Sequence, residues 1–191
     1  MFECNDKSAL MRFEQAELDD PSPRKEVNGR VIHITRMDSY AQPRQYRAPE
    51  VILKVPWGPK IDIWNVGCLI WDMFEGRNLF DGIDRKDGVY RGRAHLAEMI
   101  TLLGPPPAGF INRGNHENKF FSESVKGQWI ADTEPLPPKT LEYLETSLEG
   151  ADKQLLLQLM RKMLQWALED RKTAKELAKD PWIIKHGLDC V

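Results

Sequence analysis

The spacing of apolar residues predicts a mainly helical chain with one helix at its centre. The segment IDIWNVGCLIWDMFEG carries apolar side chains almost all the way around a helix. This pattern predicts a helix near 61 to 76 that is buried on most sides. In AHLAEMITLLG the apolar residues follow the i, i+3, i+4, i+7 spacing of a single helix face. The helix near 92 to 103 is therefore expected to be amphipathic and peripheral.

Two further helices are predicted in the C-terminal part of the chain. Helical spacing returns in ADKQLLLQLMRKMLQW, near 151 to 166, after an irregular stretch over 105 to 140. A final helix near 173 to 180 is indicated by Thr173 and Glu176. These two residues have the spacing of a capping box, in which both side chains satisfy backbone N–H groups at a helix start.

The front of the chain predicts loops and at most a short β-hairpin. Prolines and the Asn28-Gly29 dipeptide interrupt LDDPSPRKEVNGR, so this stretch is interpreted as an exposed loop. The following VIHITR alternates β-branched residues, as is typical of a short strand. Its possible partner is LMRF, residues 10 to 13, although the intervening loop is longer than a tight hairpin uses.

Composition limits the classes of function. The 191 residues, 41% of them hydrophobic, suffice for one domain with a sizeable core. A net charge of -2 argues against a nucleic-acid or acidic-membrane partner. No segment reaches the roughly 18 apolar residues of a membrane span, and the N-terminus has no secretory pattern. The cysteines are scattered without metal-ligand spacing. We therefore expect an intracellular protein, cytoplasmic or nuclear.

Three motifs occur in a recognisable order. They are YRAPEVIL at 46 to 53, DIWNVGCLIWDMFEG at 62 to 76 and EDRKTAKELAKDPWI at 169 to 183. Together they resemble the C-terminal lobe of a eukaryotic protein kinase. The resemblance implies a mainly α, kinase-like and truncated C-lobe over 44 to 184. It makes residues 1 to 43 a degenerate remnant of the catalytic-loop and hairpin region, and 185 to 191 a tail.

Details of these motifs resemble one group of kinases. Tyr46-Arg47 before Ala-Pro-Glu, and LLGPPP after the amphipathic helix, are similar to the group of cyclin-dependent, MAP and SR-protein kinases. The phrase DIWNVGCLIWDMFEGRNLFDG most resembles the SR-protein kinases, especially those of fungi. The resemblance implies phosphorylation of Ser or Thr in proteins, with ATP and magnesium as cofactors. It also implies a protein substrate or partner, and leaves the oligomeric state open.

The resemblance assigns roles to several side chains. Glu50 and Arg171 match a buried ion pair of kinases, and Asp62 matches the aspartate that anchors the catalytic loop through its backbone N–H groups. Tryptophans within the motifs are expected in the core. Four histidines, none with a partner at metal-ligand spacing, are interpreted as ordinary residues.

Arg47 matches the characteristic arginine of the activation segment, and its guanidinium fork suits a phosphate. Ser39 and Tyr40 lie just upstream. They are either the phosphorylation site that Arg47 would meet or ordinary hydroxyls of a polar loop.

A docking surface is also suggested. SR-protein kinases hold basic Arg-Ser substrates in an acidic groove, whose counterpart here is the region near 84 to 101. Two groove carboxylates are missing, which leaves possible substitutes in Asp81, Asp84, Asp87 and Glu98. A neighbouring basic cluster can bind phosphate or an acidic peptide, or simply face solvent: Arg85, Lys86, Arg91 and Arg93.

The motifs of phosphoryl transfer are not found in the sequence. It has no Gly-rich loop, no VAIK-like lysine, no catalytic His-Arg-Asp and no Asp-Phe-Gly. SALMRFE resembles the segment after the catalytic loop, and in that alignment Ser8 replaces the magnesium-binding Asn, Asn5 the lysine and Glu3 the catalytic Asp. We therefore expect no catalytic, cofactor-binding or metal-binding residue in this chain.

Three hypotheses remain open. The chain is a fragment or shortened product of an SR-protein-kinase-like enzyme that is inactive alone, or a non-catalytic, pseudokinase-like binding module that docks a partner through 92 to 103 and 105 to 140. The third hypothesis is residual catalysis, with a separate chain that supplies the N-lobe and the magnesium loop.

Overall fold

A computed structural model describes most of the chain. The described residues are 15, 18, 24–27, 29–33, 42–114, 119–122, 128–133 and 137–187. The chain forms two compact units, Met1–Asp38 and Ser39–Val191.

The N-terminal unit contains a two-stranded antiparallel hairpin, β1 Arg24–Val27 and β2 Arg30–His33. Asn28-Gly29 joins the strands, and Gly29 has a φ of 72°. Such a dipeptide favours a two-residue hairpin turn, which requires positive φ angles. The interpretation of this stretch as an exposed loop was therefore wrong, because Arg24–Val27 forms β1 and pairs with β2. A two-residue turn closes at a lower entropic cost than the long loop to residues 10 to 13, which lie outside the described part of the chain.

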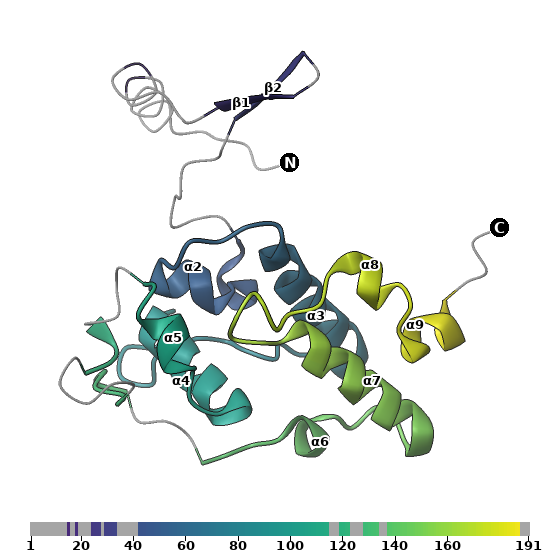
Figure 1. Cartoon of the computed structure of the whole chain (residues 1–191). Coiled ribbons are helices and arrows are strands. Elements are labelled where there is room, and N and C mark those ends of the chain that lie inside the picture. Colours follow the sequence, from purple (N-terminus) through teal and green to yellow (C-terminus); the bar gives the residue numbers. More distant parts are fainter. Residues whose placement is uncertain are drawn as a thin grey trace. The chain divides into compact units, whose positions relative to one another are not determined.

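Helix α3, Lys60–Glu75, forms the centre of the second unit and confirms the helix predicted near 61 to 76 (Figure 1). It ends at Gly76, which has a φ of 64° and donates its N–H to the Asp72 carbonyl. One side of α3 packs against α7, Gly150–Met163. At Gly67 the two helices approach so closely that an added Cβ would lie 3.2 Å from Leu164 Cδ2.

Burial of α3 on most sides was predicted wrongly. Trp64, Cys68 and Trp71 are fully buried. The opposite side is open, with Leu69 exposed to 45% and Met73 to 77%. Among the described residues, no helix packs over this face. An apolar pattern all around a helix therefore shows which faces need a partner, but not whether this chain supplies it.

The remaining helices of the second unit are shorter. They are η1 Arg44–Tyr46, α2 Pro49–Leu53, α4 Gly92–Leu103, α5 Ala108–Ile111, α6 Leu141–Leu144, α8 Ala174–Leu177 and α9 Pro181–His186. Helix α4 has the predicted bounds. Helix α5 lies in a stretch that was expected to be irregular.

Two predicted helices end early. Helix α7 stops at Met163, where Leu164 leaves the helical conformation, although the prediction reached 166. Helix α8 has the predicted capping box but stops at Leu177 instead of 180. The reason is that Asp180 caps a new helix, α9, because its side chain accepts the N–H of Trp182. Asp180 also precedes Pro181, and the helical conformation is unfavourable for a residue before proline.

A single hydrophobic core holds these helices together. Its members include Trp64 and Trp71 of α3, Met160 of α7 and Met99 of α4. Trp182 and Trp166 also belong to this core and are slightly more exposed than these residues. Within the described residues, no helix is both long enough and apolar enough to cross a bilayer.

Candidate functional site

The segment before α2 is held in place by one buried side chain. Gln42 is almost fully buried, and its Oε1 accepts the N–H of Ala48 at 2.8 Å. Its Nε2 donates to the carbonyl of Ile61 at 3.0 Å. Because these bonds join the segment to both α2 and α3, the backbone of residues 42–48 is fixed at two points.

Arg44 and Tyr46 lie in η1, and Arg47 follows directly after it. Tyr46 Oη donates to Asp72 Oδ2 at 2.6 Å, and this hydrogen bond raises the pKa of Tyr46 to about 12. The guanidinium of Arg47 lies 5.4 Å from the ring centroid of Tyr90, and that of Arg44 lies 5.9 Å from it. Both distances allow attraction between a cation and the face of the ring. Ser39 and Tyr40 lie outside the described residues.

The expected ion pair is present in the core. Arg171 Nη1 lies 2.6 Å from Glu50 Oε1, and Nη2 lies 3.0 Å from Oε2, with both side chains fully buried. Arg171 also donates to the carbonyls of Lys60 and Gln165, and its guanidinium lies 5.2 Å from the ring of Trp64. One arginine thus joins α2, the start of α3 and the loop after α7.

Asp62 lies in the first turn of α3 and is exposed. Its expected partner is the catalytic loop, and the corresponding residues, Glu3, Asn5 and Ser8, lie outside the described part of the chain. The anchoring role of Asp62 therefore remains a prediction.

His95 of α4 stands out among the histidines, a feature that the sequence did not reveal. Its side chain is fully buried, with Nδ1 3.0 Å from Tyr90 Oη and its ring 5.4 Å from that of Phe80. Burial, reinforced by the charge of Arg47, lowers the pKa of His95 to about 3. The imidazole is therefore neutral at physiological pH and serves as a packed polar member of the core.

Two adjoining hollows lie beside α4. The larger, of about 520 Å³, is lined by Ile83, Ala97 and Trp129, among others. The smaller, of about 360 Å³, is lined by apolar residues of α3 and α4 and by exposed cations. Arg85 and Glu98 line both.

The carboxylates suggested as a docking surface are engaged within the protein. Asp84 is 2% exposed and lies 2.6 Å from Arg93 Nε. The N–H of Lys86 and the guanidinium of Arg93 lower the pKa of Asp84. Asp87 lies 2.7 Å from Arg91 Nη2, and this contact lowers its pKa as well.

Glu98 is engaged in a different way. It accepts the N–H groups of Asp81 and Gly82 at 2.9 and 3.0 Å, while burial raises its pKa. None of the three carboxylates therefore presents an unshared negative charge at the surface. Within the described residues, no group of three or more His, Cys, Asp or Glu side chains is placed to hold a metal ion.

Comparison with known families gives a match over most of the chain. Residues 25–183 match the family described as the protein kinase domain. The matched range includes η1, α2 and all the later helices up to the start of α9.

Comparison with individual proteins gives relatives among the serine/threonine kinases. A serine/threonine protein kinase of Aspergillus fumigatus is 38% identical over 94% of this chain and 51% of its own length. The serine/threonine-protein kinase SRPK of Physarum polycephalum is 34% identical over 74% of this chain and 33% of its own length. Dual specificity tyrosine-phosphorylation-regulated kinase 3 of the rat is 28% identical over 80% of this chain and 28% of its own length. The chain thus spans about half the length of the A. fumigatus protein.

Proposed function

Because this chain belongs to the protein kinase domain family, we propose that it is the substrate-side, C-terminal lobe of a protein serine/threonine kinase of the SR-protein-kinase type. The buried pair of Glu50 and Arg171 is the observation that carries this proposal. It joins α2, which directly follows Arg47, to the segment ahead of the last helices. A charged pair with no exposure is costly to place in a core, and it holds this segment in one conformation.

We further propose that the chain does not transfer phosphate by itself. ATP bound with magnesium supplies the phosphoryl group in this family, and we assign no residue of this chain to bind either. Its own residues would position the substrate side. Gln42 fixes the backbone ahead of α2, Tyr46 and Asp72 attach η1 to α3, and Arg47 lies beside Tyr90.

A thermal-shift titration of the purified chain with Mg-ATP tests the second proposal. A ligand that binds only the folded state raises the Tm through RT ln(1 + [L]/Kd). We expect no shift at millimolar Mg-ATP and no phosphate transfer to a protein substrate. A magnesium-dependent rise in Tm would contradict the proposed inactivity.

A chimera tests the first proposal. The N-terminal half of the A. fumigatus kinase, fused ahead of residue 42 of this chain so that Gln42 is kept, would supply the parts that bind ATP. We expect this chimera to phosphorylate a protein substrate, and Arg171→Met to remove the activity. A folded chimera that binds Mg-ATP but transfers no phosphate would contradict the role of a substrate-side lobe.

A non-catalytic binding module is the second candidate function. The hollows beside α4 favour it, because they lie outside the segment from Gln42 to α2. A partner captured through these hollows, combined with an inactive chimera, would replace the first proposal with this one.

A further inference from the structure

The smaller hollow beside α4 combines an apolar floor with a charged rim. Trp71 and Phe80 are fully buried beneath it, and Leu102 is half-buried. Its volume of about 360 Å³ accommodates a bulky side chain. We call this hollow, with its rim residues Arg77, Arg85 and Lys139, the α4 hollow.

Two cations of this rim, Arg85 and Lys139, are less engaged than the neighbouring basic residues. Arg91 and Arg93 are paired with carboxylates, and Lys86 Nζ lies 2.6 Å from Asp132 Oδ2. Arg77 Nη2 lies 3.8 Å from Glu75 Oε2 and donates to the carbonyl of Leu144. Within the described residues, no carboxylate lies in salt-bridge distance of Arg85 or Lys139.

The carboxylates of the rim are occupied. Asp81 accepts a hydrogen bond from Asn78 Nδ2 at 3.3 Å. Glu98 accepts two backbone N–H groups, and its half-buried position leaves little of its charge for a ligand. Arg85 and Lys139 are thus the cations of this rim that have no salt-bridge partner among the described residues, so they are available to a negative ligand.

We propose that the α4 hollow binds an acidic peptide segment of a protein partner. One bulky apolar side chain of this segment enters the floor between Phe80 and Leu102, and its flanking Asp or Glu carboxylates meet Arg85 and Lys139. This preference is opposite in charge to the basic Arg-Ser ligand that the kinase resemblance implies. It goes beyond the proposed function, because binding in the hollow requires neither ATP nor phosphoryl transfer.

Fluorescence anisotropy on the full chain, without nucleotide, tests this proposal. The probe is a fluorescein-labelled peptide with one leucine flanked on both sides by Asp and Glu. Two comparison peptides are used. In the first, every acidic residue is replaced by its amide, and the second consists of Arg-Ser repeats. We expect only the acidic peptide to bind, with an affinity that falls as NaCl is raised because salt screens exposed charges.

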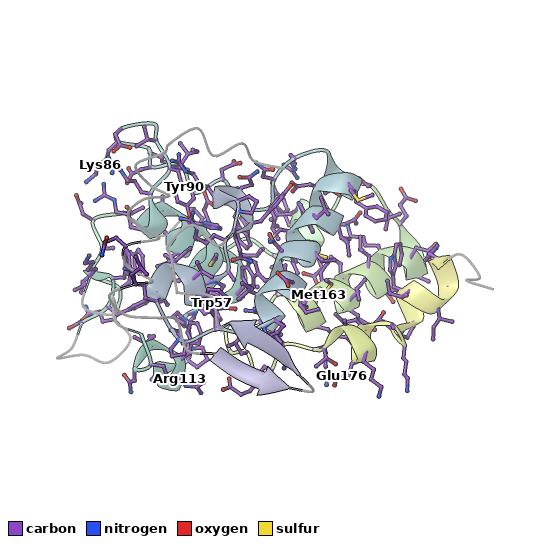
Figure 2. The ribbon with its side chains drawn as sticks, turned by 90° about the horizontal axis from the view of Figure 1, so that it is seen from above. Trp57, Lys86, Tyr90, Arg113, Met163 and Glu176 are labelled. Carbon is purple, nitrogen blue, oxygen red and sulfur yellow. The ribbon has the colours of Figure 1, made fainter. Side chains whose placement is uncertain are left out.

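Charge reversal locates the binding site. The double variant Arg85→Glu/Lys139→Glu is expected to weaken binding of the acidic peptide by about tenfold or more, since two attractions become repulsions. The matched control is Lys175→Glu/Lys179→Glu, which changes the net charge equally on exposed residues in and just after α8. Figure 2 shows Glu176 of α8 well away from Lys86 and Tyr90. This control should change the Kd by less than about twofold.

Several outcomes would overturn the proposal. They are equal binding of the amide peptide, tighter binding of the Arg-Ser peptide, and a folded Arg85→Glu/Lys139→Glu variant with unchanged affinity. If that variant has a lowered Tm, Arg85→Gln/Lys139→Gln takes its place and should still weaken binding by about threefold. The kinase assignment would stand in each case, because its tests use nucleotide and the chimera.

Discussion

Single side chains in this protein join segments that are far apart in the sequence. Arg171 reaches Glu50 across 121 positions and donates to two further carbonyls. A buried guanidinium with so many partners is costly to leave unpaired, because each lost partner exposes a charge to a medium that solvates it poorly.

Arg171→Met is expected to lower the free energy of unfolding by about 3 to 5 kcal/mol, because it strands the Glu50 carboxylate in the core. Urea unfolding followed by circular dichroism measures this loss. Arg113→Met is the control, since Arg113 and Glu169 form an exposed ion pair at 2.5 Å. It should cost at most about 1 kcal/mol. Equal losses in the two variants would show that burial adds nothing to the Glu50–Arg171 contact.

His95 should make stability depend on pH below about 6.5. Burial lowers its pKa from 6.5 to about 3 in the folded chain. Above pH 6.5 the imidazole is neutral in both states. Below pH 6.5, the unfolded chain takes up a proton at this imidazole and the folded chain does not. The free energy of unfolding therefore decreases by about 1.4 kcal/mol for each unit by which the pH is lowered.

Urea unfolding at pH 7.0 and at pH 5.5 measures this dependence, with His95→Phe as the comparison. The phenyl ring retains an aromatic side chain between Phe80 and Tyr90 but has no titrating nitrogen. We expect the loss of stability between the two pH values to be much smaller in this variant. The same loss in both proteins would assign the pH dependence to other groups.

At the scale of elements, α3 and α7 meet at a point where only a glycine fits easily. A Cβ at Gly67 would lie 3.2 Å from Leu164 Cδ2 and 3.3 Å from Met163 Cβ. Figure 2 shows Met163 in the middle of the unit. Contacts this short force the neighbouring side chains to move.

Gly67→Val is expected to destabilise the protein by about 1 to 3 kcal/mol through overpacking of this contact. Thermal unfolding measures the change. Gly109→Val is the matched control in helix α5, because a Cβ there meets nothing within 4 Å. That control should change stability by less than about 1 kcal/mol. A neutral Gly67→Val would mean that α3 and α7 separate at little cost.

At the scale of the whole molecule, the second unit exposes one apolar stripe. Val66, Leu69 and Met73 lie along one face of α3, exposed to between 45% and 77%. Contiguous apolar surface of this kind favours association, whereas single exposed apolar residues are normal.

Leu69→Ser/Met73→Ser should reduce the binding of 1-anilinonaphthalene-8-sulfonate, which detects exposed apolar surface. The measurement compares the fluorescence of the dye in the presence of the native chain with its fluorescence in the presence of the variant. Ile184→Ser is the control, since Ile184 of α9 is 69% exposed but is not part of the α3 stripe. An unchanged fluorescence in the α3 variant would contradict an accessible stripe. The double variant should change stability by no more than about 1 kcal/mol, because both side chains are already largely exposed.

Much of the fold could be predicted because its signals are local. The spacing of apolar residues placed α3, α4 and α7, and a four-residue capping pattern placed the start of α8. The hairpin was mispredicted although its signal was equally local, since Asn28-Gly29 was interpreted as an interruption instead of a turn.

The sequence by itself determined helices α3, α4 and α7, the start of α8 and, through three ordered motifs, the resemblance to kinases that the family match supports. Only the tertiary structure decided which face of α3 is covered, that His95 is buried, and that Asp84 is neutralised by Arg93. The physical reason is that helix periodicity and capping depend on neighbours within a few residues. Burial, pKa and charge pairing depend on which distant segments meet, and a residue pattern does not contain that information.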